Sequence, residues 1–211
     1  MSIVPLWSFL AVTVPLVLTP GASTAVVLRN SISGGIRAGV ETAAGVNGGS
    51  VVYGLISAFG LALALRNWPA VWTALRVGGG LYLVWLALRS LHAAFAPQHA
   101  RAIEQIDAAP RPLLRNLKEG FLTNLLNPSI ASFYLIVIPQ FVPRDAPVVP
   151  SVLLLTLIHV CLALTWHLVW ATGGGTLARV LARGRARRVL DGVTGVALVF
   201  LAARVWVGGL R

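Results

Sequence analysis

Residues 148–172 read VVPSVLLLTLIHVCLALTWHLVWAT, a stretch without a single Asp, Glu, Lys or Arg. About 20 consecutive apolar residues are enough for a helix to cross the hydrocarbon core of a bilayer. Five further stretches of this character lie at 6–28, 38–65, 69–91, 119–142 and 189–210. Backbone polar groups need internal partners in hydrocarbon, and no strand-like alternation of polar and apolar residues occurs. We therefore predict a bundle of six transmembrane helices.

The composition of the whole chain agrees with a membrane protein. Its 211 residues are 57% hydrophobic and 11% charged, with a mean hydropathy of +0.82, whereas soluble domains carry about 25% charged residues. Six spans leave room only for short loops, so we expect an all-α integral membrane protein with one domain, 1–211. The first apolar run continues to Leu28, past the length of a signal peptide's apolar region, and we expect it to be a retained span.

Basic residues are distributed unevenly between the two sides of this arrangement. The loops after the first, third and fifth spans hold twelve of the 17 Lys and Arg residues. By the positive-inside rule, these loops are predicted to be cytoplasmic and both termini external. The longest loop, 92–117, is predicted to connect two inverted three-helix halves, 1–91 and 118–211. The basic residues interrupt apolar spans and no RNA-binding motif occurs, so we expect the bilayer, and no nucleic acid, as a partner.

Two of the six spans are interrupted by proline motifs. Thr19-Pro20-Gly21 lies in the first span and Asn127-Pro128-Ser129 in the fourth. Thr and Asn are good N-caps and Pro is tolerated at the first helical position, so each motif is expected to begin a new half-helix. Ordinary proline kinks are the alternative. A capped pair, with one member in each half, is more typical of transporters.

The proline motifs define the candidate substrate site. Half-helix N-termini carry partial positive charge and free N–H groups, which in many carriers hold a substrate carboxylate near the midplane. The first span is predicted to run inward and the fourth outward, so the two N-termini should face each other across the bundle. The candidate substrate-binding residues are Thr19, Pro20, Gly21, Asn124, Asn127, Pro128 and Ser129.

Few ionisable residues lie within the spans, and each has two interpretations. Glu41 either faces the bundle interior or forms an interfacial pair with Arg37, four residues earlier. His159 is either a neutral histidine bonded to a neighbouring helix or a proton carrier. Asp191 and Glu119 each begin a span, where a carboxylate caps the helix or couples protons. The proton-coupling candidates are Glu41, His159 and Asp191.

Glycines are expected to let neighbouring helices approach closely, because lipid offers no hydrophobic drive for helix association. Gly45, Gly48 and Gly49 lie in the second span, and Gly78, Gly79 and Gly80 in the third. Packing is the preferred interpretation, and a hinge is the alternative.

Catalytic and metal-binding patterns are missing from the sequence. Cys161 is the only cysteine, which excludes an intramolecular disulfide and a Cys-x-x-Cys pair. No H-E-x-x-H, Walker loop or G-x-S-x-G occurs. We expect no cofactor, no metal and no enzymatic activity. An inorganic-cation carrier would need several Asp, Glu or His residues within its spans, so it ranks below a transporter of small zwitterions, and a membrane enzyme ranks lower still.

A series of short motifs runs in order along nearly the whole chain. It comprises Thr19-Pro20-Gly21, Gly35-Ile36-Arg37-Ala38-Gly39, Gly80-Leu81-Tyr82-Leu83, the run GFLTNLLNP at 120–128, Pro139-Gln140-Phe141 and LDGVTG at 190–195. In order and spacing, the series resembles the lysine exporter (LysE/RhtB) family of amino-acid efflux transporters. The resemblance implies export of amino acids or related small zwitterions across the bacterial inner membrane by proton antiport, with both proline motifs at the transport site. A homodimer is left open.

The sequence departs from the family pattern at both proline motifs. Ala22 stands where the first motif usually ends in a second proline, and Ser129 and Ile130 stand where the second usually continues with Lys-Ala. The missing lysine removes a cation that could meet a substrate carboxylate. The substrate of a named relative therefore does not transfer directly to this chain.

Overall fold

The computed structural model describes residues 5–68, 70–95, 112–182 and 185–207, and every regular element among them is helical. The elements are α1 (Leu6–Leu18), α2 (Ala22–Asn67), α3 (Ala70–Phe95), α4 (Leu113–Leu125), α5 (Pro128–Ser132), the π-helical turn η1 (Phe133–Val137), the 3-10 turn η2 (Ile138–Phe141), α6 (Val148–Ala182) and α7 (Arg185–Val207). The all-helical prediction is confirmed for the described residues.

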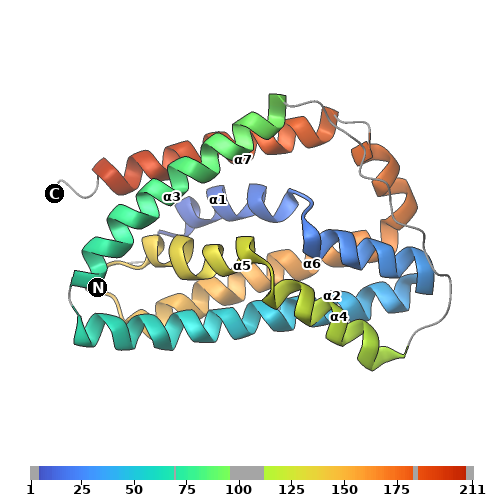
Figure 1. The fold of residues 1–211 in the computed structure, drawn as a ribbon, viewed down its shortest axis with the longest axis horizontal. Coiled ribbons are helices and arrows are strands. Elements are labelled where there is room, and N and C mark those ends of the chain that lie inside the picture. The colour runs from blue at the N-terminus through green and yellow to red at the C-terminus, as the bar shows by residue number, and fades with distance from the viewer. Residues whose placement is uncertain (1–4, 69, 96–111, 183–184, 208–211) are drawn as a thin grey trace.

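Helix α2 consists of two stretches, 22–34 and 36–67, that run in opposite directions (Figure 1). The chain reverses at Gly35, whose φ of 77° is outside helical geometry and is accessible mainly to glycine. The Asn30 side-chain amide donates a hydrogen bond to the Thr42 hydroxyl at 2.9 Å, which joins the two stretches next to the turn. The first break and this reversal therefore place residues 22–34 alongside the second stretch.

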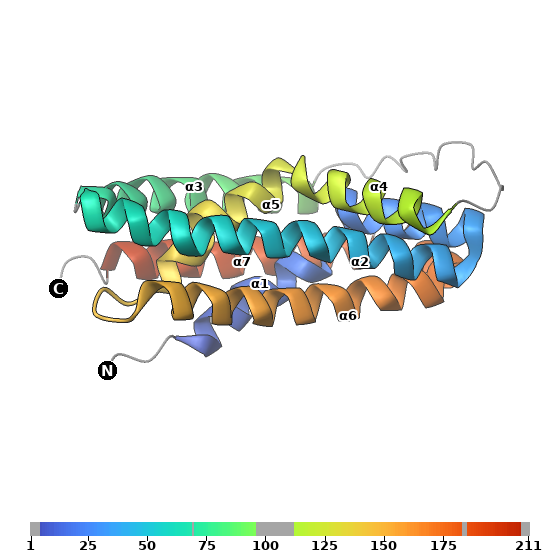
Figure 2. The same cartoon turned by 90° about the horizontal axis from the view of Figure 1, so that it is seen from below.

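The helices form an elongated bundle (Figures 1 and 2). α2 packs along α4 and α6, and α3 packs along α7. Between these two groups lie α1 and the bent segment 128–141. Their side chains fill the core, where Phe9 of α1 packs edge-on against Phe141 at 5.2 Å between ring centroids. The fully buried members of this core include Leu83 of α3, Leu155 of α6 and Leu198 of α7.

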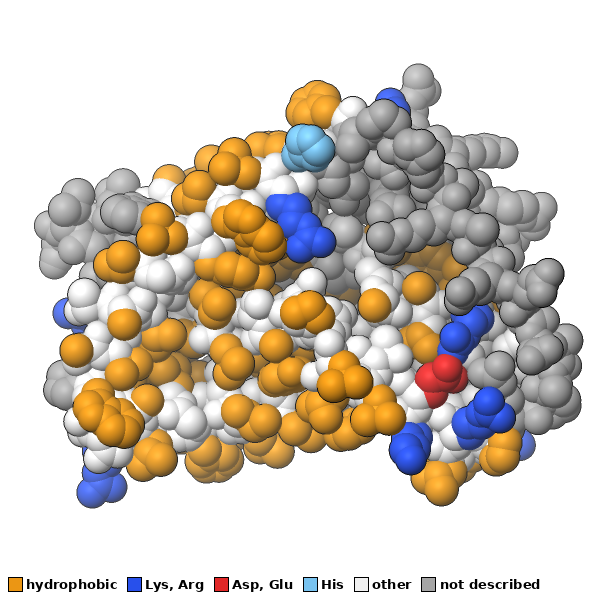
Figure 3. Space-filling model, viewed as in Figure 1, with side chains coloured by type: hydrophobic (Ala, Val, Ile, Leu, Met, Phe, Trp, Pro, Cys, Tyr) orange, Lys and Arg blue, Asp and Glu red, His pale blue; other side chains and the backbone are white. Residues whose placement is uncertain are grey.

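Three described helices are long and apolar enough to cross a membrane: 22–67, 73–92 and 148–173. Helix α4 and the segment 128–141 are bent by 56° at their junction, and they count as a fourth candidate if the pair is one broken span. Helix α1 is apolar but shorter. Large apolar side chains cover much of the face shown in Figure 3, as contact with lipid requires. A count of six crossings with inverted halves remains a prediction.

Three helix boundaries differ clearly from the predicted spans. The first stretch of α2 continues to residue 34 instead of ending at 28, α4 begins at Leu113 instead of residue 119, and α6 continues to Ala182 instead of ending at 172. Apolar length marks only the part of a helix that lies in hydrocarbon. Backbone hydrogen bonds continue past it into polar sequence, so hydropathy places the helix ends too early or too late.

Candidate functional site

The first break occupies the residues between Leu18 and Ala22. Thr19 ends α1 in an extended conformation with ψ 114°, as expected for a residue that precedes proline. Its hydroxyl donates to the carbonyl oxygen of Pro15 at 2.9 Å and lies 3.1 Å from the Thr194 hydroxyl of α7.

The predicted cap at the first break is therefore wrong in detail. Gly21, not Thr19, is the N-cap of α2, and it has no side chain to accept a hydrogen bond. Pro20 consequently lies outside the helix, before its first turn. The Thr19 hydroxyl points back to α1, and α2 begins two residues later with Gly21 as its N-cap, so the N-terminal N–H groups of α2 have no side-chain cap.

The second break has the predicted geometry. Asn127 is the N-cap of α5, its side-chain oxygen accepts from the backbone N–H of Ser129 at 3.0 Å, and Pro128 follows at the first helical position. The Tyr53 hydroxyl of α2 donates to the carbonyl oxygen of Leu125 at 2.7 Å, so it satisfies one acceptor that the end of α4 leaves free. This break is thus held against the second stretch of α2.

Asn124 lies one turn before the second break and faces the bundle interior. It is 1% exposed, and it packs against the backbone of Gly49, where a Cβ atom would come within 2.8 Å of its Oδ1. Within the described part of the chain, Oδ1 of Asn124 has no hydrogen-bond partner. A buried amide oxygen in this state is an acceptor available to a water or a ligand.

The structure does not bring all seven candidate residues into one buried site. Gly21, Pro128 and Ser129 are exposed, and Asn127 is partly buried. The first break contacts α7 through Thr194, while the second contacts α2 through Tyr53. Among the hydrogen bonds of the described residues, none joins one break directly to the other.

Two carboxylates anchor a polar network where α4 begins. Glu119 forms an ion pair with Arg29 and accepts from the Asn30 amide at 2.9 Å. Glu41 accepts from Arg37 at 2.9 Å and from the Asn116 amide at 2.8 Å. The network, defined by Arg29, Asn30, Arg37, Glu41, Asn116 and Glu119, joins both stretches of α2 to α4.

For Glu41 both interpretations hold, because it pairs with Arg37 and also faces α4. Sequence reasoning missed Asn30 and Asn116. Both are asparagines within three residues of a charged residue at the end of an apolar span, and this pattern could have identified them.

His159 has the environment of a histidine bonded to a neighbouring helix. It is buried, its Nδ1 lies 2.8 Å from the Tyr134 hydroxyl, and its ring packs on Phe133 at 4.6 Å between centroids. Asn47, which sequence reasoning also missed, lies 3.2 Å from Nδ1 of the buried His167. Asp191 lies in α7, and its side chain is outside the described part of the structure.

A comparison with models of protein families identifies the family of this chain. The model of the LysE type translocators matches residues 14–209, which include both breaks and the polar network. The chain belongs to the LysE family. Membership makes it a membrane translocator and not a member of an enzyme family.

Several LysE relatives align over nearly their whole length. A leucine efflux protein of Klebsiella pneumoniae is 27% identical over 94% of this chain and 92% of its own. The membrane protein YahN of Escherichia coli is 28% identical over 90% of this chain and 84% of its own. The membrane protein YrhP of Bacillus subtilis is 23% identical over 92% of this chain and 94% of its own. No solved structure matches the chain.

Proposed function

We propose that this LysE-family chain exports amino acids or closely related small zwitterions across the bacterial cytoplasmic membrane by proton antiport. The observation that carries the proposal is the Asn127-capped break, together with a second break in the first half of the chain. The leucine efflux relatives support amino acids as the substrate class. The proposal includes six crossings in one domain, with halves 1–91 and 118–211 joined by 92–117 and both termini external.

The substrate site in this proposal lies between the N-terminus of α2 and Asn124. The hydrogen bond between Asn30 and Thr42 sets the register of the two antiparallel stretches, so Val27 and Val46, each about one turn further from Gly35, lie at about the same level. Ser23 and Gly49 lie about one turn of 3.6 residues beyond these valines, on the side away from the reversal at Gly35. Gly49 contacts Asn124. The register of the helices therefore supports a site in which the start of α2 and the residues before the second break are neighbours.

The chemistry of these groups suits a zwitterion. The first N–H groups of α2 lack a side-chain cap, and the helix dipole makes them a favourable site for a carboxylate. The Oδ1 of Asn124, which no described group bonds, is an acceptor for an ammonium group. Thr19, Pro20 and Gly21 then set the start of α2, and Asn127, Pro128 and Ser129 set the end of α4.

Proton coupling is proposed to use Glu41, His159 or Asp191. Of Glu41 and His159, Glu41 is the one with an exposed partner, because its bond to Arg37 involves an exposed guanidinium, whereas His159 is buried. Glu41→Gln is expected to weaken the pH dependence of exchange, and His159→Asn is the comparison. Retention of full pH-dependent exchange in both variants would exclude both residues.

The test of the function is counterflow. Liposomes that contain the purified protein are loaded with one unlabelled amino acid at a time, and entry of the labelled form of that amino acid is measured. We expect apolar amino acids to exchange and their decarboxylated amines to be ignored. Exchange of amines at the same rate as amino acids would contradict carboxylate recognition. Exchange of divalent cations instead would favour a cation carrier.

A further inference from the structure

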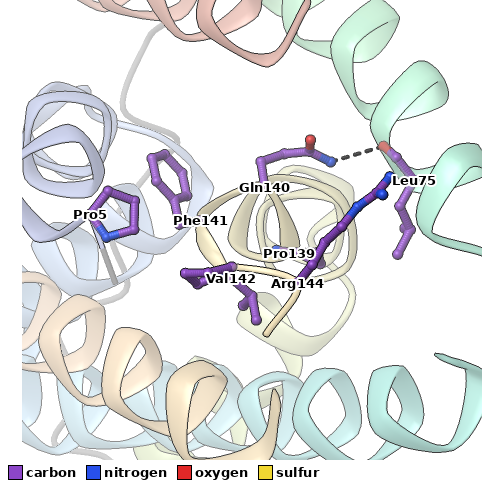
Figure 4. A pocket seen from close by; sticks show the side chains of 8 residues that line it. Pro5, Leu75, Pro139, Gln140, Phe141, Val142 and Arg144 are labelled. Carbon is purple, nitrogen blue, oxygen red and sulfur yellow. Dashed lines mark hydrogen bonds between the residues drawn. The ribbon is translucent and has the colours of Figure 1, made fainter. Parts of the chain in front are cut away.

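A cavity of about 240 Å³ opens at the far end of the segment 128–141 from Asn127 (Figure 4). Its lining comes from three parts of the fold: Pro5 before α1, Leu75 of α3, and η2 with the loop that follows it, up to Arg144. The volume is several times the roughly 30 Å³ that one water takes up in the liquid. A small organic solute therefore fits.

The lining groups have three kinds of chemistry. Pro5, Phe141 and Val142 provide apolar walls. Arg144 is exposed and extends along the cavity towards Leu75 and Gln140. The side-chain Nε2 of Gln140 donates to the carbonyl oxygens of Leu75 at 2.9 Å and Ile136 at 3.2 Å, which fixes the amide and commits both of its N–H groups.

These commitments decide what Gln140 can offer to a ligand. With both N–H groups used, its Oε1 remains as an acceptor. The residues that line the cavity therefore include a cation, a side-chain acceptor and an apolar wall, which match the carboxylate, the ammonium group and the side chain of an apolar amino acid.

We propose that this cavity is a second, outer subsite that binds an apolar amino acid as it leaves the transporter, with its carboxylate on Arg144 and its ammonium group near Gln140. The inference rests on the proposed export function. The cavity lies at the end of the segment 128–141 opposite Asn127, which is the external end in the proposed topology. A guanidinium can hold a carboxylate through two parallel hydrogen bonds, which a lysine cannot.

The test compares the two faces of the membrane. Half-saturation by labelled L-leucine is measured in right-side-out and inside-out vesicles that contain the wild type or Arg144→Gln. Loss of a charge-assisted hydrogen bond is expected to raise outer half-saturation roughly ten-fold or more, with inner half-saturation unchanged. Arg144→Lys should recover part of the loss. Arg66→Gln is the matched control, because Arg66 is an exposed arginine in the last turn of α2 that does not line the cavity.

Two results would overturn the subsite: equal outer half-saturation in Arg144→Gln and wild type, or an equal change at both faces. If the wild type transports no amino acid, the proposed function fails, and the cavity is tested by equilibrium dialysis of labelled L-leucine against purified protein. Binding that is lost in Arg144→Gln and kept in Arg66→Gln would then support the cavity alone. Absence of binding to the wild type would reject it.

Discussion

At the scale of single residues, the side chains of Asn127 and Asn124 have different roles, although the two residues lie one turn apart. Asn127 uses its side-chain oxygen to cap the helix that follows it. Asn124 is buried against Gly49, and no described group bonds its Oδ1. A cap stabilises the break, whereas a free acceptor is available to a ligand, so substitutions at the two positions should have different effects.

Asn127→Leu is expected to reduce transport more than it reduces the amount of folded protein. The change removes a cap that contributes about 0.5–2 kcal/mol to helix stability, while it keeps the apolar length of the span. Transport per molecule of purified protein is the measurement. Asn127→Asp keeps the capping oxygen and is the control. Normal transport by Asn127→Leu would make the break a kink without a role in binding.

Gly49→Ala should destabilise the protein, and Gly48→Ala should not. A Cβ at Gly49 would lie 2.8 Å from Oδ1 and 3.0 Å from Cβ of Asn124, whereas at Gly48 the nearest atom is 3.7 Å away. Overpacking of this kind costs about 1–3 kcal/mol. The midpoint of thermal unfolding in detergent measures the difference. Equal midpoints would show that α4 moves away from α2 without cost.

At the scale of elements, ion pairs and amides tie helices across the two breaks. Arg29 lies after the first break and Glu119 before the second, and their ion pair joins the first stretch of α2 to α4. Asn30 strengthens this connection, because its amide bonds both Glu119 and Thr42. If one half moves against the other, the contacts of Arg29 and Asn30 with Glu119 must either break or move as a unit.

Charge exchange tests this connection. Arg29→Glu places two carboxylates side by side, and we expect it to lower both the unfolding midpoint and the transport rate. The double variant with Arg29→Glu and Glu119→Arg restores opposite charges and should recover much of each. Arg37→Gln is the control with a small expected effect, because Arg37 is 85% exposed and Glu41 keeps Asn116. A double variant as impaired as the single one would exclude a specific pair.

At the scale of the whole molecule, the chain runs back and forth along one long axis (Figures 1 and 2). In both views the two breaks lie near the middle of this axis, with the helix after each break leading towards opposite ends. The proposed outer cavity and the polar network around Glu119 lie on opposite sides of the breaks. This order matches a path from one membrane face to the other.

The orientation of that path is a prediction of the basic asymmetry. A reporter fused after Arg211 should be active outside the cytoplasm, and one inserted near Gln98 should be active inside. Alkaline phosphatase and a fluorescent protein give opposite readouts for each position. Reversed activities would exchange the proposed inner and outer ends, and Arg144 would then face the cytoplasm.

The sequence by itself determined the helical class, the membrane environment and the position of both breaks. These follow from local physics: apolar length sets where a helix can cross lipid, and a proline next to a capping or glycine residue favours a helix boundary. The capping at Asn127 was predictable for the same reason, because the capping residue, the proline and the N–H donor of Ser129 are adjacent in the chain.

Only the tertiary structure decided which side chains meet. Asn30 and Glu119 are 89 residues apart in sequence, and Tyr53 and Leu125 are 72 apart. Their contacts depend on the register of packed helices, which a one-turn shift would change without altering any local pattern. Thr19 failed as the predicted cap because its hydroxyl bonds Pro15 and lies beside Thr194 of α7. The bond to Pro15 is local, but the contact with Thr194, 175 residues away, depends on packing, and local sequence does not contain that information.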